Sequence, residues 1–245
     1  MLEQMDISRL KSERRRAPSR KVFESVFDNQ TLIALEQLIR KGFFDELTGI
    51  VSAGKEAHIY HGTGDWGEVA IKIYMVEASD FKNMSKYVRG DPRFSSWKNR
   101  RQLIGLWASK EFKNLSRVQG HVSSPRPIGF NKNVLVMEFI GEDGIPSPRL
   151  KDKDPADPGG YYTTIVDYMR KMYKLRLVHS DLSEYNILDD GSKPVVIDFS
   201  AGVLLDHPQA REFLERDVAN IVNYFKRLRV DADYDKALKV VTGGD

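Results

Sequence analysis

The sequence predicts an α+β protein in two parts, a strand-rich front part and a helical back part. Short apolar runs separated by glycine-containing turns lie between residues 48 and 139. After residue 160, many apolar residues recur at the spacing of helices. The stretch 141–160 between the two parts is rich in Gly, Pro and Asp, which is typical of a linker.

The front part begins with a helix predicted at residues 30–41, which Asp28 or Asn29 caps and Gly42 ends. Apolar runs from residue 48 to residue 74 then predict a β-meander with tight turns. The front part is therefore expected to combine one helix with short strands that follow one another closely.

A second helix is predicted at residues 102–119, and a further strand at residues 134–139. The apolar stripe of this helix consists of Ile104, Trp107, Leu115 and Val118. In the back part, helices are predicted at about 161–176, 208–228 and 233–241. An Asp-Gly pair at residues 190–191, between two apolar runs, predicts a hairpin.

The stretch 82–101 holds seven basic residues and one acidic residue. Gly90 and Pro92 break any regular pattern there, so the stretch is expected to be an irregular insert. Long irregular inserts in compact domains are usually functional or mobile.

Composition excludes several functions. The chain has no Cys, which rules out disulfides, cysteine nucleophiles and thiolate metal sites. Mean hydropathy is −0.45, and no long apolar run predicts a membrane span or a secretory signal.

The net charge of +3 hides an asymmetry, because residues 1–140 carry 23 basic and 16 acidic residues while the remainder is net acidic. A basic front part suggests an anionic partner.

Residues 9–21 concentrate seven of these positive charges. The run is either a solvated N-terminal helix or tail, or a contact to nucleic acid.

The strand at residues 69–72 reads VAIK, a motif with which kinases hold the phosphates of ATP. Glu111 lies on the apolar stripe of the helix at residues 102–119, and a carboxylate on a buried face needs a cation or hydrogen bonds. Lys72 is its expected partner and would grip the phosphates. The alternative is a Glu at the edge of the stripe, paired with Lys110 or Lys113.

Residues 179–186 read HSDLSEYN and have the spacing of a kinase catalytic loop. Asp181 would accept or orient the proton of the attacking hydroxyl, and Asn186 would bind Mg²⁺. Asp198 follows twelve residues later, at the end of a predicted strand, and supplies a second oxygen ligand. The alternative is that these are unrelated polar residues in loops.

Residues 52–57 read SAGKEA and lie where a nucleotide kinase would carry its glycine-rich loop. Backbone N–H groups of such a turn can point at phosphate, and Lys55 adds charge. Ser52 and Gly54 are further candidate nucleotide-binding residues. The alternative is an ordinary hairpin loop.

Four segments together resemble one family. Residues 52–57, 70–72, 179–186 and 197–200 (SAGKEA, AIK, HSDLSEYN and IDFS) are similar to motifs of the RIO family of atypical serine/threonine protein kinases, and most like its first subfamily. The resemblance covers most of the chain. The family's more usual loop reads STGKEA, so Ala53 removes one hydroxyl near the expected phosphates.

The resemblance implies a two-lobed protein-kinase-like fold, with a β-rich N-lobe at residues 27–140 and a truncated helical C-lobe at residues 141–245. Residues 1–26 would form a basic segment that packs on the kinase domain. No Ala-Pro-Glu motif follows Asp198, so the C-lobe is expected to lack an activation segment and peptide-binding helices. The insert at residues 82–101 would be the family's flexible loop.

Further residue roles follow from the same resemblance. Met137, Glu138 and Ile140 would belong to the hinge that binds adenine through backbone groups. Ser96, and less favourably Ser95, would be autophosphorylation sites in the flexible loop; the alternative is that both are ordinary exposed serines.

The resemblance implies a serine/threonine kinase that uses ATP with Mg²⁺ or Mn²⁺ and acts in the cytoplasm on small ribosomal subunit maturation. Its expected partners are the subunit precursor and its RNA, with no membrane or DNA contact and a monomeric chain favoured. Three alternatives remain: an ATPase switch on pre-ribosomal particles, a small-molecule kinase of the aminoglycoside-phosphotransferase type, and a catalytically silent RNA-binding scaffold.

Overall fold

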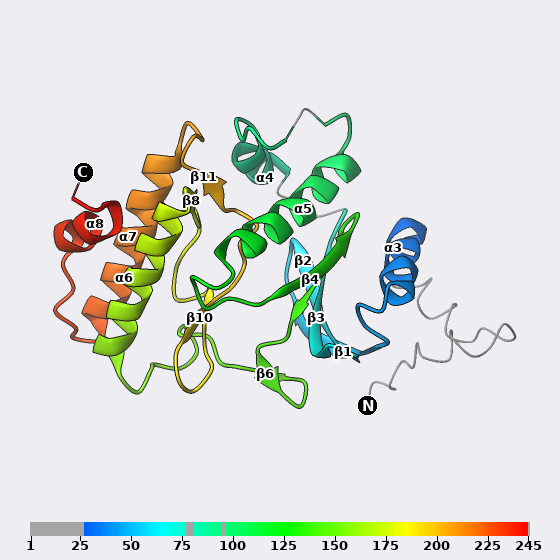
Figure 1. Cartoon of the computed structure of the whole chain (residues 1–245), viewed down its shortest axis with the longest axis horizontal. Helices are drawn as coiled ribbons and strands as arrows, with labels where there is room; N and C mark the ends of the chain where they lie inside the picture. The colour runs from blue at the N-terminus through cyan, green and yellow to red at the C-terminus, as the bar shows by residue number, and fades with distance from the viewer. Residues whose placement is uncertain (1–26, 77–80, 95–96, 245) are drawn as a thin grey trace, which may run out of the picture. The chain divides into compact units, whose positions relative to one another are not determined.

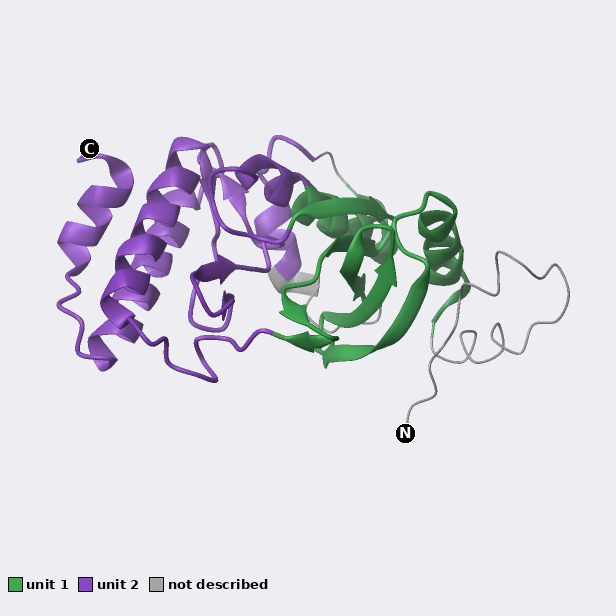
Figure 2. Ribbon diagram, turned by 60° about the horizontal axis from the view of Figure 1, so that its bottom comes forward, with its two compact units in different colours: residues 1–81, 97–112, 126–146 green, residues 82–96, 113–125, 147–245 purple. Residues whose placement is uncertain are grey.

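The computed structural model describes residues 27–76, 81–94 and 97–244. The basic run at residues 9–21, Ser95 and Ser96 lie outside these residues. The chain divides into two compact units, which Figure 2 distinguishes by colour. Unit 1 comprises residues 1–81, 97–112 and 126–146, and unit 2 comprises residues 82–96, 113–125 and 147–245.

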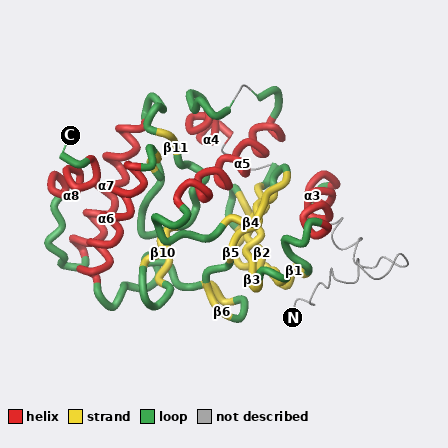
Figure 3. Tube along the Cα trace, in the orientation of Figure 1, coloured by secondary structure: helices red, strands yellow, loops and turns green. Residues whose placement is uncertain are grey.

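Unit 1 is built on a five-stranded antiparallel sheet with strand order β1-β2-β3-β5-β4 (Figures 1 and 3). Its strands are β1 (Glu46–Ala53), β2 (Ala57–Gly64), β3 (Gly67–Tyr74), β4 (Pro127–Asn131) and β5 (Val134–Glu138). A short hairpin of β6 (Gly141–Glu142) and β7 (Ile145–Pro146) follows. The predicted β-meander is confirmed as β1 to β3.

Helix α3 (Asn29–Arg40) packs against β4 and β5 and closes the core of unit 1. Of the two predicted caps, Asp28 is the one used: its side chain accepts hydrogen bonds from the backbone N–H groups of Gln30 and Thr31. The core joins apolar residues of the helix to those of the sheet, including Leu35, Leu38, Leu47, Ile71 and Val136.

Strand β1 is irregular along its pairing with β2. The register shifts once between Leu47 and Gly49 and again between Ile50 and Ser52. In the partner strand, a Cβ atom at Gly62 would lie 2.6 Å from the carbonyl oxygen of Glu46, so only glycine allows the two strands to approach this closely.

Helix α5 (Arg100–Val118) contributes its residues 100–112 to unit 1 and its residues 113–118 to unit 2. Its predicted stripe is buried throughout, with Ile104, Trp107, Leu115 and Val118 at most 2% exposed. A helix with such a face needs packing partners along its length, which explains why it runs through both units.

Unit 2 is mainly helical. It contains α4 (Phe81–Val88, whose first residue belongs to unit 1), α6 (Pro158–Lys174), α7 (Ala210–Arg227) and α8 (Tyr234–Thr242). Two small antiparallel pairs complete it, β8 (Leu177–Val178) with β11 (Val203–Leu204) and β9 (Ile187–Asp189) with β10 (Pro194–Val196). Helix α6 packs against both α7 and α8. The hairpin predicted at residues 190–191 is confirmed as β9–β10.

One prediction about an irregular stretch is wrong. The insert at residues 82–101 is not without regular structure, because α4 occupies its start and α5 begins at Arg100. Gly90 adopts a positive φ of 93° after the helix, so Gly90 and Pro92 end α4 rather than preventing it. The boundary between the two units falls inside the predicted linker at residues 141–160, after residue 146. This stretch also contains the β6–β7 hairpin and the first residues of α6, where Pro158 is compatible with a helix start.

None of the helices in the described part of the chain combines the length and the apolar character needed to cross a membrane.

Candidate active site

Unit 1 holds a buried ion pair between β3 and α5. The Lys72 Nζ atom lies 3.0 Å from the Glu111 Oε1 atom, and both side chains are almost fully buried. The Tyr74 hydroxyl donates to the other carboxylate oxygen, and the Lys72 ammonium lies 5.2 Å from the centre of the Tyr74 ring. A buried carboxylate is costly unless it is paired and hydrogen-bonded, and here Glu111 is both. The structure thus brings together the two residues that the sequence paired.

Strand pairing fixes the position of Lys72 along the sheet. Lys72 lies opposite Ile59 of β2 and Leu135 of β5, in the central strand of the five. Because both neighbours are hydrogen-bonded along their length, the backbone that carries this lysine is among the most constrained of unit 1.

The segment at residues 52–57 forms the tight turn between β1 and β2. The Gly54 N–H donates to the Ala57 carbonyl oxygen at 3.0 Å, so this N–H closes the turn and does not point outward to a phosphate. Ser52 and Lys55 are exposed. A nucleotide could therefore be contacted here by the Ser52 hydroxyl and the Lys55 ammonium.

The residues assigned to the hinge follow one another at the end of β5. Met137 is buried, and the Glu138 N–H donates to the Arg126 carbonyl oxygen at 2.8 Å. Ile140 is half-buried and lies just beyond the strand. The Glu138 N–H is thus bonded to the residue just before β4, and Ile140 begins the connection to β6.

Two polar residues that sequence reasoning missed lie beside the segment predicted as the hinge. The Glu68 Oε1 atom accepts a hydrogen bond from the Gly144 N–H at 2.7 Å and lies 2.9 Å from His61 Nε2. The His61 ring packs edge-on against Phe139, with ring centres 4.8 Å apart. These contacts tie the β6–β7 hairpin to the sheet. No sequence motif marks them, because they depend on strand register.

Unit 2 holds the second group of predicted residues, in the loop between β8 and β9. The Asn186 Nδ2 atom donates to the Asp181 carbonyl oxygen at 2.8 Å and to its Oδ2 atom at 3.2 Å. The Ile197 N–H donates to the Asn186 carbonyl oxygen at 3.0 Å. The loop and the turn that carries Asp198 are therefore joined by backbone, and the structure brings all three predicted polar residues together.

Asp198 has an unusual backbone, with a φ of 59°. Its Oδ1 atom accepts a hydrogen bond from the Ser200 hydroxyl at 2.6 Å. A positive φ is uncommon for a residue other than glycine and is frequent at functional sites.

Neighbouring charges and partial burial shift the pKa of Asp181. Partial desolvation raises the pKa of Asp181 above its ordinary value, and the negative charge of Asp198 raises it further. Arg216, the Asn186 side chain and Lys86 act in the opposite direction. Two carboxylates that repel each other in this way are a setting in which a bound cation is favourable.

The donor set also suits Mg²⁺. The Asn186 amide nitrogen faces Asp181, which leaves its oxygen, together with the Asp198 carboxylate, as candidate hard ligands. The residues that the structure describes contain no group of three or more His, Cys, Asp or Glu side chains that could hold a metal. Mg²⁺ is commonly bound by one or two protein carboxylates plus substrate phosphates and waters, so the residues present fit this ion.

Asp217 on α7 supports the loop and was also missed by sequence reasoning. Its side chain is 1% exposed and accepts hydrogen bonds from the backbone N–H groups of Ser180 at 2.7 Å and Leu182 at 3.0 Å. Burial raises the pKa of Asp217 to about 8, against the opposing effect of these N–H groups. The signal was present, since Asp217 lies on a buried helical stripe just as Glu111 does. The neighbouring Arg216 donates to the Ser180 carbonyl oxygen.

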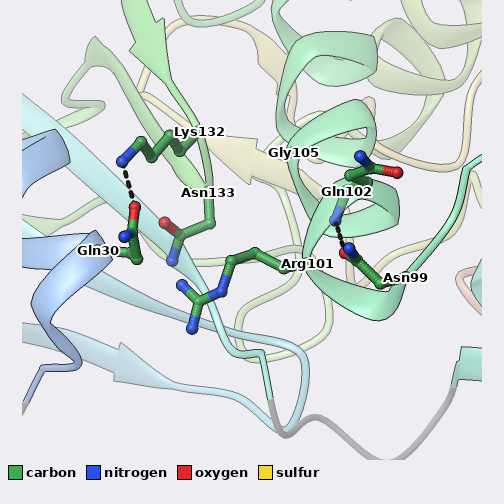
Figure 4. A pocket seen from close by; sticks show the side chains of 7 residues that line it. All are labelled: Gln30, Asn99, Arg101, Gln102, Gly105, Lys132 and Asn133. Atoms are coloured by element: carbon green, nitrogen blue, oxygen red, sulfur yellow. Dashed lines mark hydrogen bonds between the residues drawn. The ribbon is translucent and has the colours of Figure 1, made fainter.

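A pocket of about 320 Å³ lies elsewhere in unit 1 (Figure 4). Its lining residues are Gln30, Asn99, Arg101, Gln102, Gly105, Lys132 and Asn133. Its polar side chains are largely occupied: Lys132 bonds Gln30, and the Asn99 oxygen accepts the Gln102 N–H at 3.0 Å. None of the predicted site residues lines this pocket.

Comparison with solved structures identifies the fold as that of protein kinases. Two crystal structures of the Rio2 kinase from Chaetomium thermophilum, one described as its ADP/Mg²⁺-phosphoaspartate complex, superpose with TM-scores of 0.68 and 0.66 at 24% sequence identity. The matches cover 88% and 87% of this chain and 67% and 68% of theirs. The predicted α+β, protein-kinase-like fold is thereby confirmed.

Residues 58–237 match the RIO domain. The chain is 44% identical to the RIO-type serine/threonine-protein kinase Rio1 of Methanocaldococcus jannaschii, over 96% of this chain and 81% of that protein. It is 42% identical to the RIO-type serine/threonine-protein kinase Rio1 of Haloferax volcanii, over 92% of this chain and 79% of that protein. It is 40% identical to the human serine/threonine-protein kinase RIO1, over 92% of this chain and 40% of that protein. The chain therefore belongs to the RIO family of serine/threonine kinases. Membership implies that it binds ATP.

Proposed function

We propose that the chain is an ATP- and Mg²⁺-dependent, autophosphorylating serine/threonine kinase of the first RIO subfamily. The observation that carries this proposal is the joined set of Asp181, Asn186 and Asp198 in unit 2. These residue types match the needs of phosphoryl transfer, in which catalysis is mostly placement and neutralisation of charge.

Unit 1 supplies the cation for the nucleotide. Lys72 contacts the α- and β-phosphates, and its bond to Glu111 holds the ammonium in place for this task. The Tyr74 hydroxyl keeps the Glu111 carboxylate oriented toward the lysine. The Ser52 hydroxyl and the Lys55 ammonium contact the phosphates, while Gly54 closes the turn between them. The backbone at Met137, Glu138 and Ile140 contacts adenine.

Unit 2 supplies the groups that act on the transferred phosphoryl. Asn186 and Asp198 hold Mg²⁺ or Mn²⁺, which neutralises charge on the phosphates when it is bound. The oxygen of a Ser or Thr hydroxyl attacks the γ-phosphorus, the bond to the β-phosphate oxygen breaks, and ADP leaves. Asp181 orients the hydroxyl and takes its proton.

A second candidate is ATP turnover that acts as a switch. The description of the similar Rio2 kinase structure includes ADP, Mg²⁺ and phosphoaspartate. In this chain, the corresponding reaction would place the phosphoryl group on the Asp198 carboxylate, from which water would remove it.

The partner of either activity is proposed to be the small ribosomal subunit precursor and its RNA. The basic balance of residues 1–140 supports an anionic partner. A cytoplasmic, monomeric chain that contacts neither membrane nor DNA completes this proposal. The scaffold alternative would use the same charges without ATP.

Radiolabelled ATP tests these candidates. If the chain is a kinase, the wild type should carry acid-stable label on Ser or Thr. The labelling rate should fall at least 100-fold in Asp181→Ala, because this change removes the general base. It should fall by a comparable factor in Asp198→Ala. Asp190→Asn is the matched control, because Asp190 lies in the exposed β9–β10 turn, and it should label normally.

An acyl phosphate that is labile in alkali, absent from Asp198→Ala, would favour the ATPase switch instead. Undiminished labelling of Asp181→Ala would overturn the assignment of Asp181. A chain that neither labels nor hydrolyses ATP would favour the scaffold.

A further inference from the structure

Asn114 connects α5 to the turn that follows Asp198. Its side chain is fully buried, and its Nδ2 atom donates to the carbonyl oxygens of Phe199 at 2.8 Å and Gly202 at 2.9 Å. One amide group therefore holds both ends of the turn. All these residues belong to unit 2.

The turn is packed so closely that Asn114 is part of its geometry. A Cβ atom at Gly202 would lie 2.8 Å from Asn114 Nδ2 and 3.2 Å from the Phe199 carbonyl oxygen, so a side chain at this position would displace the amide. The Gly202 N–H also donates to the Phe199 carbonyl oxygen at 3.1 Å. The turn thus has little freedom while Asn114 is in place.

A second pair of residues fixes Asn114 itself. The Arg93 Nη1 atom donates to the Asn114 Oδ1 atom at 2.7 Å. Arg93 also donates two hydrogen bonds to the Asp91 carboxylate, from Nε to Oδ1 at 2.9 Å and from Nη2 to Oδ2 at 2.7 Å. Asp91 is 2% exposed. Since a guanidinium can only donate, it requires the amide oxygen to face it, and the amide nitrogen then faces the two carbonyl oxygens.

We propose that Asn114 is a positioning residue for Asp198, and that Asp91 and Arg93 act through it. This inference rests on the proposed role of Asp198 as a metal ligand. The positive φ of Asp198 costs free energy and persists only where the surroundings enforce it. The Asp91–Arg93–Asn114 chain of hydrogen bonds supplies this enforcement, because it holds the carbonyl oxygen of the very next residue.

Asp91 and Arg93 both lie within the basic stretch at residues 82–101. The middle of this stretch makes a buried polar contact that reaches, through Asn114, the turn that follows Asp198. Groups that orient metal ligands typically change metal affinity by 10–100-fold when they are removed. Loss of Arg93 should therefore weaken Mg²⁺ use without removing any group that contacts the nucleotide.

The test compares Arg93→Gln with the matched control Arg89→Gln. Both changes remove one positive charge from the same segment, but the Arg89 side chain is exposed and has no place in the hydrogen-bond chain. In Arg93→Gln, the Mg²⁺ concentration for half-maximal activity should rise about 10-fold. The ATP concentration for half-maximal activity at saturating Mg²⁺ should change less than about twofold. Loss of even one hydrogen bond to the nucleotide would change it by more than that. Arg89→Gln should have the wild-type values of both concentrations.

A second readout does not depend on activity. Amide hydrogen exchange of residues 198–204, measured without nucleotide, should be faster in Arg93→Gln than in Arg89→Gln, because the Gly202 N–H loses its fixed partner. Arg93→Lys keeps one donor and should be intermediate. Asn114→Leu serves as a stronger variant, judged only if its thermal unfolding remains cooperative.

The outcomes separate this inference from the proposed function. If Arg93→Gln and Arg89→Gln behave alike in both measurements while Asp198→Ala is inactive, the positioning role is wrong and the metal role of Asp198 stands. If Asp198→Ala keeps its activity and its Mg²⁺ requirement, the proposed function itself is wrong.

Discussion

At the scale of single residues, Asp181 shows how surroundings set a proton affinity. Desolvation and the charge of Asp198 raise its pKa, whereas Arg216 lowers it. The carboxylate is the form that can take a proton from a hydroxyl, so activity should fall as the pH drops through this raised pKa. The acidic limb of kcat/KM should accordingly lie above the ordinary pKa of 3.8.

Replacement of Arg216 should move this limb further. In Arg216→Gln, the pKa of Asp181 loses an influence that lowers it and therefore rises further, which shifts the acidic limb of the kcat/KM profile to higher pH. The matched control is Arg211→Gln, which removes an exposed arginine of the same helix that pairs with Glu215. Profiles of the two variants that coincide would contradict this account of Asp181.

Residues with a motif were predictable, and residues that act through the backbone were not. Lys72, Asp181, Asn186 and Asp198 were predicted from motifs and their spacing, and Glu111 from its place on an apolar stripe; the structure pairs Lys72 with Glu111 and groups the other three. Asp217 and Asn114 hydrogen-bond backbone groups 35 to 88 residues away, so their partners appear only once the chain has folded.

At the scale of elements, α7 acts as the support of the loop that carries Asp181. Asp217→Asn keeps one acceptor but places an NH₂ group against the second backbone N–H. Because an unsatisfied buried donor is costly, the free energy of unfolding at pH 5 should fall by about 1–3 kcal/mol, as measured by urea denaturation.

The pH dependence of stability tests the same residue. With a pKa of about 8 in the folded state and 3.8 in the unfolded state, the folded chain binds more protons between these values. Asp217 therefore contributes most stability below about pH 4 and loses this contribution as the pH rises through 8. The deficit of Asp217→Asn should shrink between pH 5 and pH 8.5. A constant deficit would show that Asp217 is ionised throughout.

Long periodic elements were predictable to within a few residues, as α5 and α7 show. The failure at α4 has a clear cause, which is that Gly and Pro end helices as readily as they break them. The sequence indicated where these residues lie but not on which side of them the helix would form.

At the scale of the whole molecule, the order of a strand-rich part before a helical part was predictable from composition. The strand order β1-β2-β3-β5-β4 was not, because it depends on pairings between residues such as Ile71 and Val136 that are far apart in the chain. The RIO resemblance supplied the fold where periodicity could not.

The proposed RNA partner leads to a prediction about charge. Binding to small-subunit precursor RNA should weaken with salt, with a slope of roughly −0.7 per phosphate contacted in single-stranded RNA. Replacing Arg14, Arg15 and Arg16 by Gln should make the slope shallower by about 2 in a filter-binding titration, equivalent to three lost contacts.

The control replaces Lys151, Lys153 and Lys174 of the acidic back part by Gln. This variant carries the same change in net charge and should keep the wild-type slope. Equal losses in both variants would mean that the RNA responds to net charge rather than to the basic run.

The irregular pairing of β1 has a consequence for the protein in concentrated solution. β1 lies at one edge of the described sheet, where an unbroken strand would offer its outer backbone groups as a template for another chain. The two register shifts bend and twist this edge, so an incoming strand cannot stay in register along it. The irregular pairing of β1 therefore discourages edge-to-edge aggregation.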